Sequence, residues 1–285
     1  MDHQPVGNGN IGSRTVVITG GNTGLGFGCA NTILKSPNGA PWHIILACRD
    51  EGRAQAAVDQ LTSGLGVVGQ VEAMALDLSS LASVRAFAAE LKKRLSTGTI
   101  PPLHAVVCNA GVNPLNTKTV TADGFESTFG INHLGHFLLV NELRPALHSP
   151  ARVVVVASGV HDPAQKAGVP VPAWNETAAL AHGELGPAAA SDNAFAAGQR
   201  RYSTSKLANV AAKRQRQDGR AQLNGRRDPI DATEPLVHGR DNGLRAVATR
   251  VCGERTNHPH ADRQRDRKEY EGRDATPREH ARPVS

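Results

Sequence analysis

Short apolar segments alternate with amphipathic segments along the first 210 residues of the chain. The apolar segments are five or six residues long and rich in β-branched side chains, which is typical of buried strands. The segments between them carry apolar residues at helical spacing. Strands that alternate with helices favour right-handed crossover units and a parallel sheet. The pattern therefore predicts an α/β fold with a doubly wound parallel sheet and helices on both of its faces.

The same pattern places the individual elements. Strands are predicted at residues 15–19, 43–48, 71–76, 103–107 and 152–157. Helices are predicted at residues 25–34, 54–61, 81–91 and 124–147, and a further helix carries residues 202–206. Residues 161–199, which are rich in alanine, glycine and proline, are expected to form a loop between the last strand and the last helix.

From residue 211 onward the pattern is lost. Only 19 of the 75 residues from 211 to 285 are hydrophobic, and neither a helical nor a strand period persists. The segment holds 17 lysines and arginines against 12 acidic residues, so most of the net charge of +6 comes from it. A segment this poor in apolar side chains buries too little surface to offset its ordering entropy. Two interpretations stand: a solvated, disordered tail, or a stretch that is not in its original reading frame.

Several classes of protein are disfavoured by what the sequence lacks. Residues 1–13 have no apolar core or cleavage pattern, so we expect a disordered tail there and no secretory signal. The longest glycine-free apolar run, Val153 to Ala157, is far shorter than the roughly 20 residues of a membrane-spanning helix. The cysteines show no paired or zinc-binding spacing, which favours buried thiols in a reducing compartment, and we expect a cytoplasmic protein.

A glycine-rich turn stands between the first predicted strand and the first predicted helix. Its spacing is Gly-x-x-x-Gly-x-Gly. Backbone amides at a helix N-terminus attract a pyrophosphate, and glycines let the backbone approach it. The residues of this candidate nucleotide-binding turn are Gly20, Asn22, Thr23, Gly24, Leu25 and Gly26.

The ends of the next two predicted strands bear on the choice of nucleotide. Arg49 stands where an acidic residue would bind the ribose 2′-hydroxyl of NAD, and an arginine can instead pair with the 2′-phosphate of NADP. We therefore expect NADP, although the acidic residues Asp50 and Glu51 follow Arg49 directly. The alternative for Arg49 is a surface charge at the start of a helix. Asp77 and Leu78 are placed to meet the adenine, and the alternative for Asp77 is a role in capping the following helix.

Three residues indicate acid–base chemistry. Tyr202 and Lys206 form a Tyr-x-x-x-Lys pair, which shares one face of a helix. An ammonium beside the phenol lowers its pKa from about 10 toward working pH, so that Tyr202 can exchange a proton with a carbonyl or alcohol. Ser158 follows a run of apolar residues, which places it at the carboxyl end of a strand, where parallel sheets bind ligands. Its alternative role is that of a capping serine.

Taken together, these motifs resemble the short-chain dehydrogenase/reductase family, and look most like its retinol dehydrogenase and protochlorophyllide reductase branch. The matching motifs are Thr19-Gly20-x-x-x-Gly24-x-Gly26, Asp77, Asn109-Ala110-Gly111, Asn132 within an Ile-Asn-His-Leu-Gly-His-Phe stretch, and Ser158 with Tyr202-x-x-x-Lys206. The resemblance covers residues 14–210 and implies a Rossmann-type, NADP-binding catalytic domain. It also implies hydride transfer between the nicotinamide and a carbonyl or alcohol substrate. The long interval from Ser158 to Tyr202 is similar to the insertion of protochlorophyllide reductases.

The resemblance implies a role for each candidate site residue. Tyr202 exchanges the proton with the substrate oxygen, and Lys206 holds the nicotinamide ribose and lowers the pKa of the tyrosine. Ser158 orients the carbonyl. Asn132 supports a proton-relay water through the helix backbone, and the segment from Asn109 to Gly111 lines the cofactor and braces the sheet.

No metal site is expected. His133 and His136 are three residues apart, but no third ligand accompanies them, and zinc sites need three or four. We predict instead that both histidines pack and form hydrogen bonds within the predicted helix at residues 124–147, the central helix.

The resemblance ends near residue 210. Beyond this point the family adds a sixth and a seventh strand, a Pro-Gly turn at the nicotinamide and a helix pair over the substrate. None of these can be recognised in this sequence; residues 234–239 come nearest to such a strand and turn, and they match poorly. We expect the helix of Tyr202 to lose its pattern after Val210 and the sheet to be incomplete at its C-terminal edge, with the fifth strand exposed there. The family's dimer contact through its last helix is therefore expected of intact relatives rather than of this chain.

Three hypotheses about function remain open. The first is an NADP-dependent short-chain oxidoreductase acting on a small-molecule carbonyl or alcohol. The second is a catalytically defective, truncated or frameshifted product with residual or no nucleotide binding. The third is a binding protein that uses its basic C-terminal tail on nucleic acid or an acidic partner. The tail's 12 acidic residues and its lack of aromatic interleaving rank the third hypothesis last.

Overall fold

The computed structural model describes residues 13–35, 41–63, 70–114, 116–222 and 230–232, and only the backbone is described for residues 213–222 and 230–232. The chain divides into two compact units, Met1–Gly253 and Glu254–Ser285, and all described residues belong to the first. The predicted tail at residues 1–12, the strand candidate at residues 234–239 and most of the segment from residue 211 onward lie outside the described residues.

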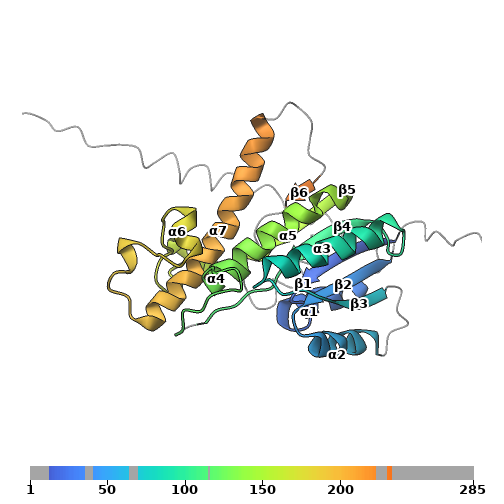
Figure 1. Cartoon of the computed structure of the whole chain (residues 1–285), viewed down its shortest axis with the longest axis horizontal. Helices are drawn as coiled ribbons and strands as arrows, with labels where there is room; N and C mark the ends of the chain where they lie inside the picture. The colour runs from blue at the N-terminus through green and yellow to red at the C-terminus, as the bar shows by residue number, and fades with distance from the viewer. Residues whose placement is uncertain (1–12, 36–40, 64–69, 115, 223–229, 233–285) are drawn as a thin grey trace, which may run out of the picture. The chain divides into compact units, whose positions relative to one another are not determined.

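Six parallel strands form one sheet in the order β3-β2-β1-β4-β5-β6 (Figure 1). The strands are β1 (Arg14–Thr19), β2 (Trp42–Cys48), β3 (Gln70–Ala75), β4 (Leu103–Cys108), β5 (Leu147–Val155) and β6 (Ile230–Ala232). The five predicted strands are all present, although β5 begins five residues before its predicted start. The strand order reverses between β1 and β4, and open parallel sheets bind ligands at such a switch point.

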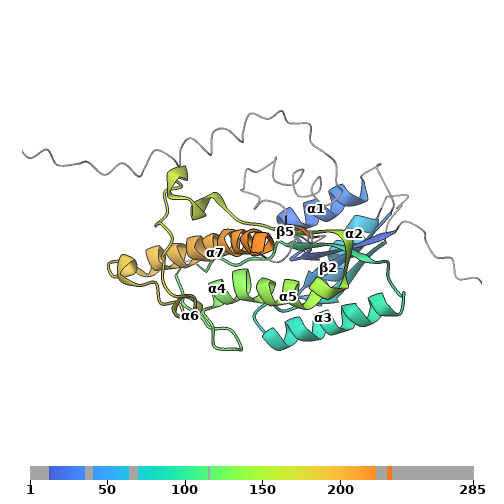
Figure 2. The same ribbon diagram turned by 90° about the horizontal axis from the view of Figure 1, so that it is seen from above.

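Helices cover both faces of the sheet (Figure 2). One layer holds α1 (Gly24–Leu34) and α2 (Glu51–Thr62), and the other holds α3 (Leu81–Ser96) and α5 (Gly135–Leu143). Alternate residues of β1 serve the two layers: Val16 and Ile18 face α1 and α2, whereas Val17 packs with α3 and α5. Burial on both faces explains the unbroken apolar strands, and it confirms the predicted Rossmann-type α/β fold. No helix within the described part of the chain is both long and apolar enough to cross a membrane.

The predicted helix at residues 124–147 is divided into four parts. These are α4 (Ser127–Phe129), a π-helical turn η1 (Gly130–Leu134), α5 and a 3₁₀ turn η2 (Arg144–Ala146). The amide of Gly135 donates to the carbonyl of Gly130, five residues back, which is the π-helical pattern. Asn132 lies within this turn, and π-helical turns of this kind are frequent at functional sites.

The C-terminal part of the fold adds two features that the sequence pattern did not predict. Helix α7 (Ala194–Gln222) continues well past Val210, because lysine, arginine, glutamine and alanine are strong helix formers even without apolar periodicity. Strand β6 pairs in parallel with residues 151–153 of β5, so the edge of β5 that we expected to be free is covered there. A three-residue strand is too short to produce a readable sequence pattern.

Residues 161–199 contain helical turns as well as the predicted loop. They include a 3₁₀ turn η4 (Pro163–Gln165), the short helix α6 (Thr177–Ala181), a second 3₁₀ turn η5 (Pro187–Ala189) and the start of α7. A further 3₁₀ turn, η3 (Gly159–His161), precedes them. Ala173 and Leu180 pack with Phe129 of α4 in a small apolar cluster, which gives the segment a core contact that its composition alone did not reveal.

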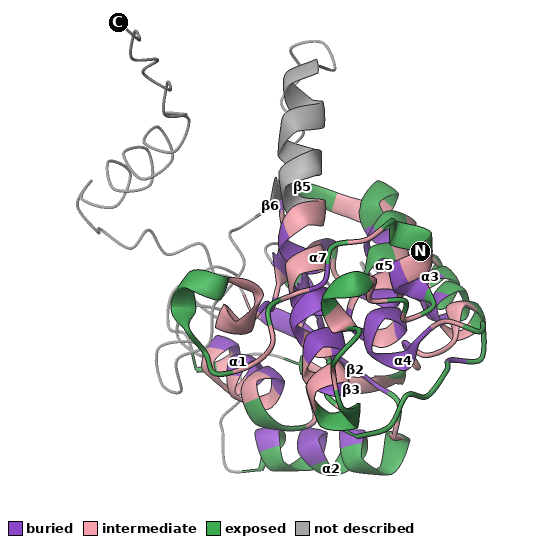
Figure 3. Ribbon diagram, turned by 90° about the vertical axis from the view of Figure 1, so that its left-hand side faces the viewer, coloured by how far each residue is buried: buried purple, intermediate pink, exposed green. Residues whose placement is uncertain are grey.

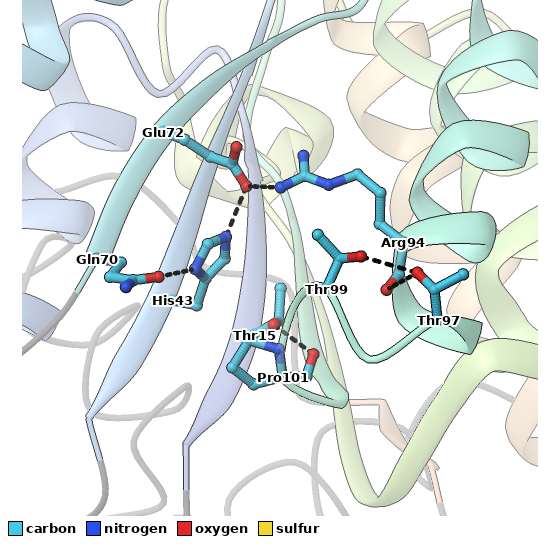
Figure 4. Close-up of polar contacts among 8 residues, drawn as sticks. All are labelled: Thr15, His43, Gln70, Glu72, Arg94, Thr97, Thr99 and Pro101. Carbon is cyan, nitrogen blue, oxygen red and sulfur yellow. Dashed lines mark hydrogen bonds and ion pairs between the residues drawn. The ribbon is translucent and has the colours of Figure 1, made fainter. Parts of the chain in front are cut away.

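A polar cluster joins the amino-terminal ends of β2 and β3 to the last turn of α3 (Figure 4). Glu72 Oε1 lies 2.6 Å from His43 Nε2 and accepts a hydrogen bond of 2.7 Å from Arg94 Nη2, while His43 Nδ1 lies 3.1 Å from Gln70 Oε1. Burial raises the pKa of Glu72, but the hydrogen bonds and charges of His43 and Arg94 outweigh it and leave this pKa below its ordinary value. The ionised carboxylate therefore stabilises the folded state.

We expect Glu72→Gln to lower the free energy of unfolding by about 1 kcal/mol at neutral pH, since it removes the charge from two hydrogen bonds. A carboxylate with a lowered folded-state pKa stabilises fully above its unfolded pKa, and this contribution is lost as the pH falls through the folded pKa. Urea unfolding of both chains from pH 7 downward measures the effect, and the two curves should converge in acid. A difference that stays constant with pH would contradict the assignment.

Candidate active site

The glycine turn at the carboxyl end of β1 has the form of a phosphate-binding loop. Gly20 has a φ of 62°, in the left-handed region, and a Cβ atom at Gly26 would lie 2.6 Å from the carbonyl oxygen of Gly20. Thr23 precedes α1 and makes no side-chain capping hydrogen bond, so no threonine hydroxyl competes for the first-turn amides of α1. Of the other predicted turn residues, Gly24 is exposed, whereas Asn22 and Leu25 are half-buried.

The end of β2 lies against this turn and presents Arg49 to solvent. The amide of Gly20 donates to the carbonyl of Ala47 at 2.9 Å. The carboxylate of Asp50 is already engaged, because it caps α2 and accepts from the backbone and Nε of Arg53, each at 2.9 Å. Arg49 itself forms no ion pair with another described residue. The arginine is thus the group at this position that is free to meet a ligand.

Asp77 and Leu78 take local roles at the end of β3. The Asp77 carboxylate accepts hydrogen bonds from the backbone N–H and the hydroxyl of Ser79, at 2.9 and 2.7 Å, and Ser80 caps α3. Leu78 is buried against the start of α5, where a Cβ atom at Gly135 would lie 2.7 Å from the carbonyl oxygen of Leu78. The structure therefore places Asp77 in the turn that we weighed as its alternative role, and its contact with adenine stays a prediction.

A buried network joins the ends of β1 and β4 to the central helix. Thr19 Oγ1 accepts from the backbone N–H groups of Asn109 and Ala110, at 2.9 and 3.0 Å, and lies 2.8 Å from His136 Nε2. His136 Nδ1 lies 3.1 Å from the carbonyl oxygen of Asn132, and because a carbonyl only accepts, Nδ1 carries the hydrogen. Burial lowers the pKa of His136 to about 4, so the ring is neutral and Nε2 is an acceptor; the Thr19 hydroxyl has Nε2 at 2.8 Å and the carbonyl of Val107 at 3.3 Å as partners for its one hydrogen.

Asn132 connects the π-helical turn to α7. Its side chain is fully buried, with Oδ1 accepting from the N–H of Val112 at 2.7 Å and Nδ2 donating to Ser205 Oγ at 3.0 Å. Asn209 Nδ2 donates to the Asn132 carbonyl at 3.2 Å, and Asn209 Oδ1 lies 2.9 Å from His133 Nδ1. Sequence reasoning missed Ser205 and Asn209, although their positions three and seven residues after Tyr202 could have indicated them.

Both histidines of the central helix are thus engaged in hydrogen bonds. Among the residues that the structure describes, no group of three or more histidine, cysteine, aspartate or glutamate side chains could hold a metal ion.

Tyr202, Lys206 and Ser158 come together at the carboxyl end of β5. Lys206 Nζ donates to the carbonyl of Val156 at 3.1 Å and lies 5.6 Å from the centroid of the Tyr202 ring. Burial lowers the pKa of Lys206 to about 8. Burial also raises the pKa of Tyr202, and a side-chain hydrogen bond with Ser158 offsets part of that rise. The lowering of the tyrosine pKa by Lys206 that we predicted is therefore absent, because burial dominates.

The cofactor-binding and catalytic candidates share one site. A Cβ atom at Gly111 would lie 3.3 Å from Asn132 Oδ1 and 3.5 Å from Lys206 Nζ. Asn109 Nδ2 donates to the carbonyls of Thr19 and Gly20 in the glycine turn, at 2.9 and 3.2 Å. A phenol, a hydroxyl and an ammonium thus stand in one site with the candidate nucleotide-binding turn, and such an arrangement can exchange a proton with a carbonyl or alcohol oxygen.

This fold and this group of side chains place the chain in the class of α/β proteins that carry a candidate dinucleotide site at the carboxyl ends of their parallel strands. The family model for short chain dehydrogenase matches residues 14–170, and the chain belongs to this family. The predicted family membership is confirmed.

Curated relatives cover the same part of the chain. The WW domain-containing oxidoreductase of Danio rerio is 46% identical over 154 residues, which are 53% of this chain and 35% of the relative. Retinol dehydrogenase 14 of Mus musculus is 43% identical over 164 residues, covering 54% and 46% of the two chains. Protochlorophyllide reductase B of Hordeum vulgare is 35% identical over 219 residues, covering 72% and 52%. The chain spans about a third to a half of the length of these relatives.

Solved structures share the fold. An uncharacterised protein from Mycobacterium paratuberculosis aligns with a TM-score of 0.59 at 30% identity, covering 86% of this chain and 78% of that one. A metagenomic short-chain oxidoreductase solved in complex with NADP aligns with a TM-score of 0.57 at 18% identity, covering 84% and 90%.

Proposed function

We propose that this chain is an NADP-dependent oxidoreductase that transfers hydride between the nicotinamide and a small carbonyl or alcohol substrate. The observation that carries the proposal is the meeting of Ser158, Tyr202 and Lys206 at the carboxyl end of β5, beside the loop that follows β4. Structures of this fold have been solved with NADP and with NAD, so the fold alone does not select the nucleotide. Arg49 is exposed, whereas the neighbouring Asp50 carboxylate is hydrogen-bonded to Arg53, so the group available to the nucleotide here is a cation, which favours NADP.

The residues present fit a dinucleotide. The first-turn amides of α1 and the close approach at Gly20 and Gly26 suit a pyrophosphate, and Arg49 would hold the 2′-phosphate. Lys206, which stands beside Gly111, would hold the nicotinamide ribose. When bound, the reduced nicotinamide supplies the hydride.

The protein's part in the reaction is the handling of the substrate oxygen. Ser158 donates a hydrogen bond that orients the carbonyl, and Tyr202 gives its phenolic proton to the oxygen as negative charge develops there. The raised pKa of Tyr202 keeps the phenol protonated at neutral pH, which suits it to act as the acid in reduction. The hydrogen bond with Ser158, which offsets part of the rise in the Tyr202 pKa, then stabilises the phenolate that remains.

The proposed location is a reducing compartment such as the cytoplasm. The cysteines of the chain show no paired or zinc-binding spacing, and Cys29, Cys48 and Cys108 are buried in the core, which suits a reducing compartment.

Nucleotide titration tests the proposal. We expect NADPH to bind more tightly than NADH, and Arg49→Ala to weaken NADPH about ten-fold while leaving NADH unchanged, because a charge-assisted contact to the 2′-phosphate is lost. Protein-to-nucleotide fluorescence transfer measures both affinities. Arg53→Ala is the matched control, since it removes a neighbouring exposed arginine that is occupied by Asp50. Tighter binding of NADH, or an equal effect of both variants on NADPH, would overturn the assignment.

A further inference from the structure

A buried ion pair joins helix α7, which carries Tyr202 and Lys206, to the central segment, residues 124–147. Arg201 Nε lies 3.5 Å from Glu126 Oε1, and the two residues are only 7% and 1% exposed. The pair lies where α4 packs against α7, in a region of mostly buried residues (Figure 3). Burying two charges carries a large desolvation cost, so such a pair is weak evidence for stability alone. Its position suggests a different use.

Glu126 is held rigidly by the elements around it. Its two carboxylate oxygens accept from the backbone N–H groups of Thr128 and Phe129, at 3.0 and 2.8 Å, and so cap α4. Its own backbone N–H donates to the carbonyl of Ala181 in α6, at 2.8 Å. Glu126 therefore offers α7 a negative charge that is fixed to the segment leading into the π-helical turn.

Arg201 precedes Tyr202 directly. Successive residues of a helix point about 100° apart, so the direction of one side chain determines the direction of the next. Arg201 Nε is buried and forms no hydrogen bond with a described residue, so the Glu126 carboxylate is the group that orients it. One turn further on, Ser205 receives the hydrogen bond from Asn132. These two contacts, on either side of Tyr202, both tie α7 to the segment that holds α4 and the π-helical turn, and they restrict the rotation of α7 about its own axis.

We propose that Glu126 and Arg201 are positioning residues that aim the Tyr202 hydroxyl at Ser158. The expected effect on catalysis rests on the proposed function. The orientation of the Tyr202 side chain can be measured without turnover. Loss of the pair would remove the contact that fixes Arg201, the residue next to Tyr202, and the Tyr202–Ser158 hydrogen bond would weaken.

The chain offers a probe specific to this side chain. Its two tyrosines are Tyr202 and Tyr270, so Tyr270→Phe leaves one tyrosine. Tyrosine labelled with ¹³C at Cζ then gives a single NMR resonance that reports the hydrogen bonding of the Tyr202 hydroxyl at neutral pH. Ser158→Ala in the same background supplies the reference position for a lost Tyr202–Ser158 contact.

Three variants separate positioning from stability. Glu126→Gln and Arg201→Met alone should each lower the melting temperature by roughly 10 °C, because each leaves one buried charge unpaired. The double variant should regain part of that loss, since it leaves no charge behind, although glutamine replaces only one of the two carboxylate oxygens that cap α4. In the double variant we expect the Tyr202 resonance to move toward its position in Ser158→Ala, and carbonyl reduction of a benzaldehyde probe with NADPH to fall at least ten-fold with the affinity for NADPH unchanged.

A second ion pair, between the buried Arg200 of α7 and the half-buried Asp192, is the matched control. Arg200 binds Asp192 through two hydrogen bonds of 2.7 and 2.9 Å, and it also donates to the carbonyl of Val171 at 2.8 Å, so it secures residues 161–199 rather than the central segment. Arg200→Met with Asp192→Asn should leave the Tyr202 resonance in place. A Glu126/Arg201 double variant whose resonance also stays in place would overturn the proposal. A chain that binds no nucleotide would instead defeat the proposed function, while the resonance would still test the pair.

Discussion

Tyr202→Phe is expected to lower the turnover of any accepted carbonyl substrate by about 10² to 10⁴-fold. The change removes one oxygen from a half-buried ring, and with it the proton that the substrate oxygen needs. The fold should be little affected, because the tyrosine hydroxyl has Ser158 rather than the core as its partner. The affinity for NADPH should stay within a few-fold of the wild-type value.

Steady-state reduction of an aldehyde panel with NADPH, followed by nucleotide absorbance, measures this effect. Tyr270→Phe is the matched control, because it makes the same chemical change at the other tyrosine of the chain and should leave turnover unchanged. Ser158→Ala should give an intermediate loss, since the proton donor remains while the orienting hydrogen bond is removed. A Tyr202→Phe chain that keeps a tenth or more of the activity would show that another group supplies the proton.

Lys206→Met is expected to stabilise the nucleotide-free protein while it removes turnover. Burial lowers the pKa of Lys206 from its ordinary 10.5 to about 8, which corresponds to a cost of about 3 kcal/mol for carrying the charge at neutral pH. A buried methionine avoids that cost but gives up the hydrogen bond to Val156, so 3 kcal/mol is the upper bound of the gain. Function that depends on an unfavourably buried charge is a common cause of such a trade-off.

The pH dependence distinguishes this explanation from better packing. Between the folded pKa near 8 and the unfolded pKa near 10.5 the unfolded chain holds more protons, so wild-type stability contributed by Lys206 rises with pH. The advantage of Lys206→Met should therefore be full at pH 7 and shrink as the pH approaches 10. Lys93→Met, at an exposed position of α3, should change stability by no more than about 0.5 kcal/mol at either pH. A Lys206→Met chain that melts below the wild type at pH 7 would contradict the prediction.

These two variants address different properties of one site. Tyr202→Phe removes a proton donor with little change in the fold, whereas Lys206→Met changes both the chemistry and the stability. The difference follows from burial: the Lys206 side chain is almost fully enclosed and donates to the carbonyl of Val156, just after β5, whereas Tyr202 is half-buried.

The sequence by itself determined the five main strands, the glycine turn, the Tyr202–Lys206 pair and membership of the short chain dehydrogenase family. All of these are local, because strand and helix periods and short motifs are written in neighbouring residues. Helix α7 beyond Val210 and strand β6 were missed because a helix of polar residues and a three-residue strand leave no apolar period.

Only the tertiary structure decided which distant residues meet. The π-helical turn around Asn132, its hydrogen bond to Ser205 and the buried pair of Glu126 with Arg201 join segments more than seventy residues apart. The tertiary structure also decided whether the pKa of Tyr202 is raised or lowered. Spacing along a helix predicts that a lysine is near, but whether burial or charge prevails depends on how much water and which carbonyl surround the two groups in the folded chain.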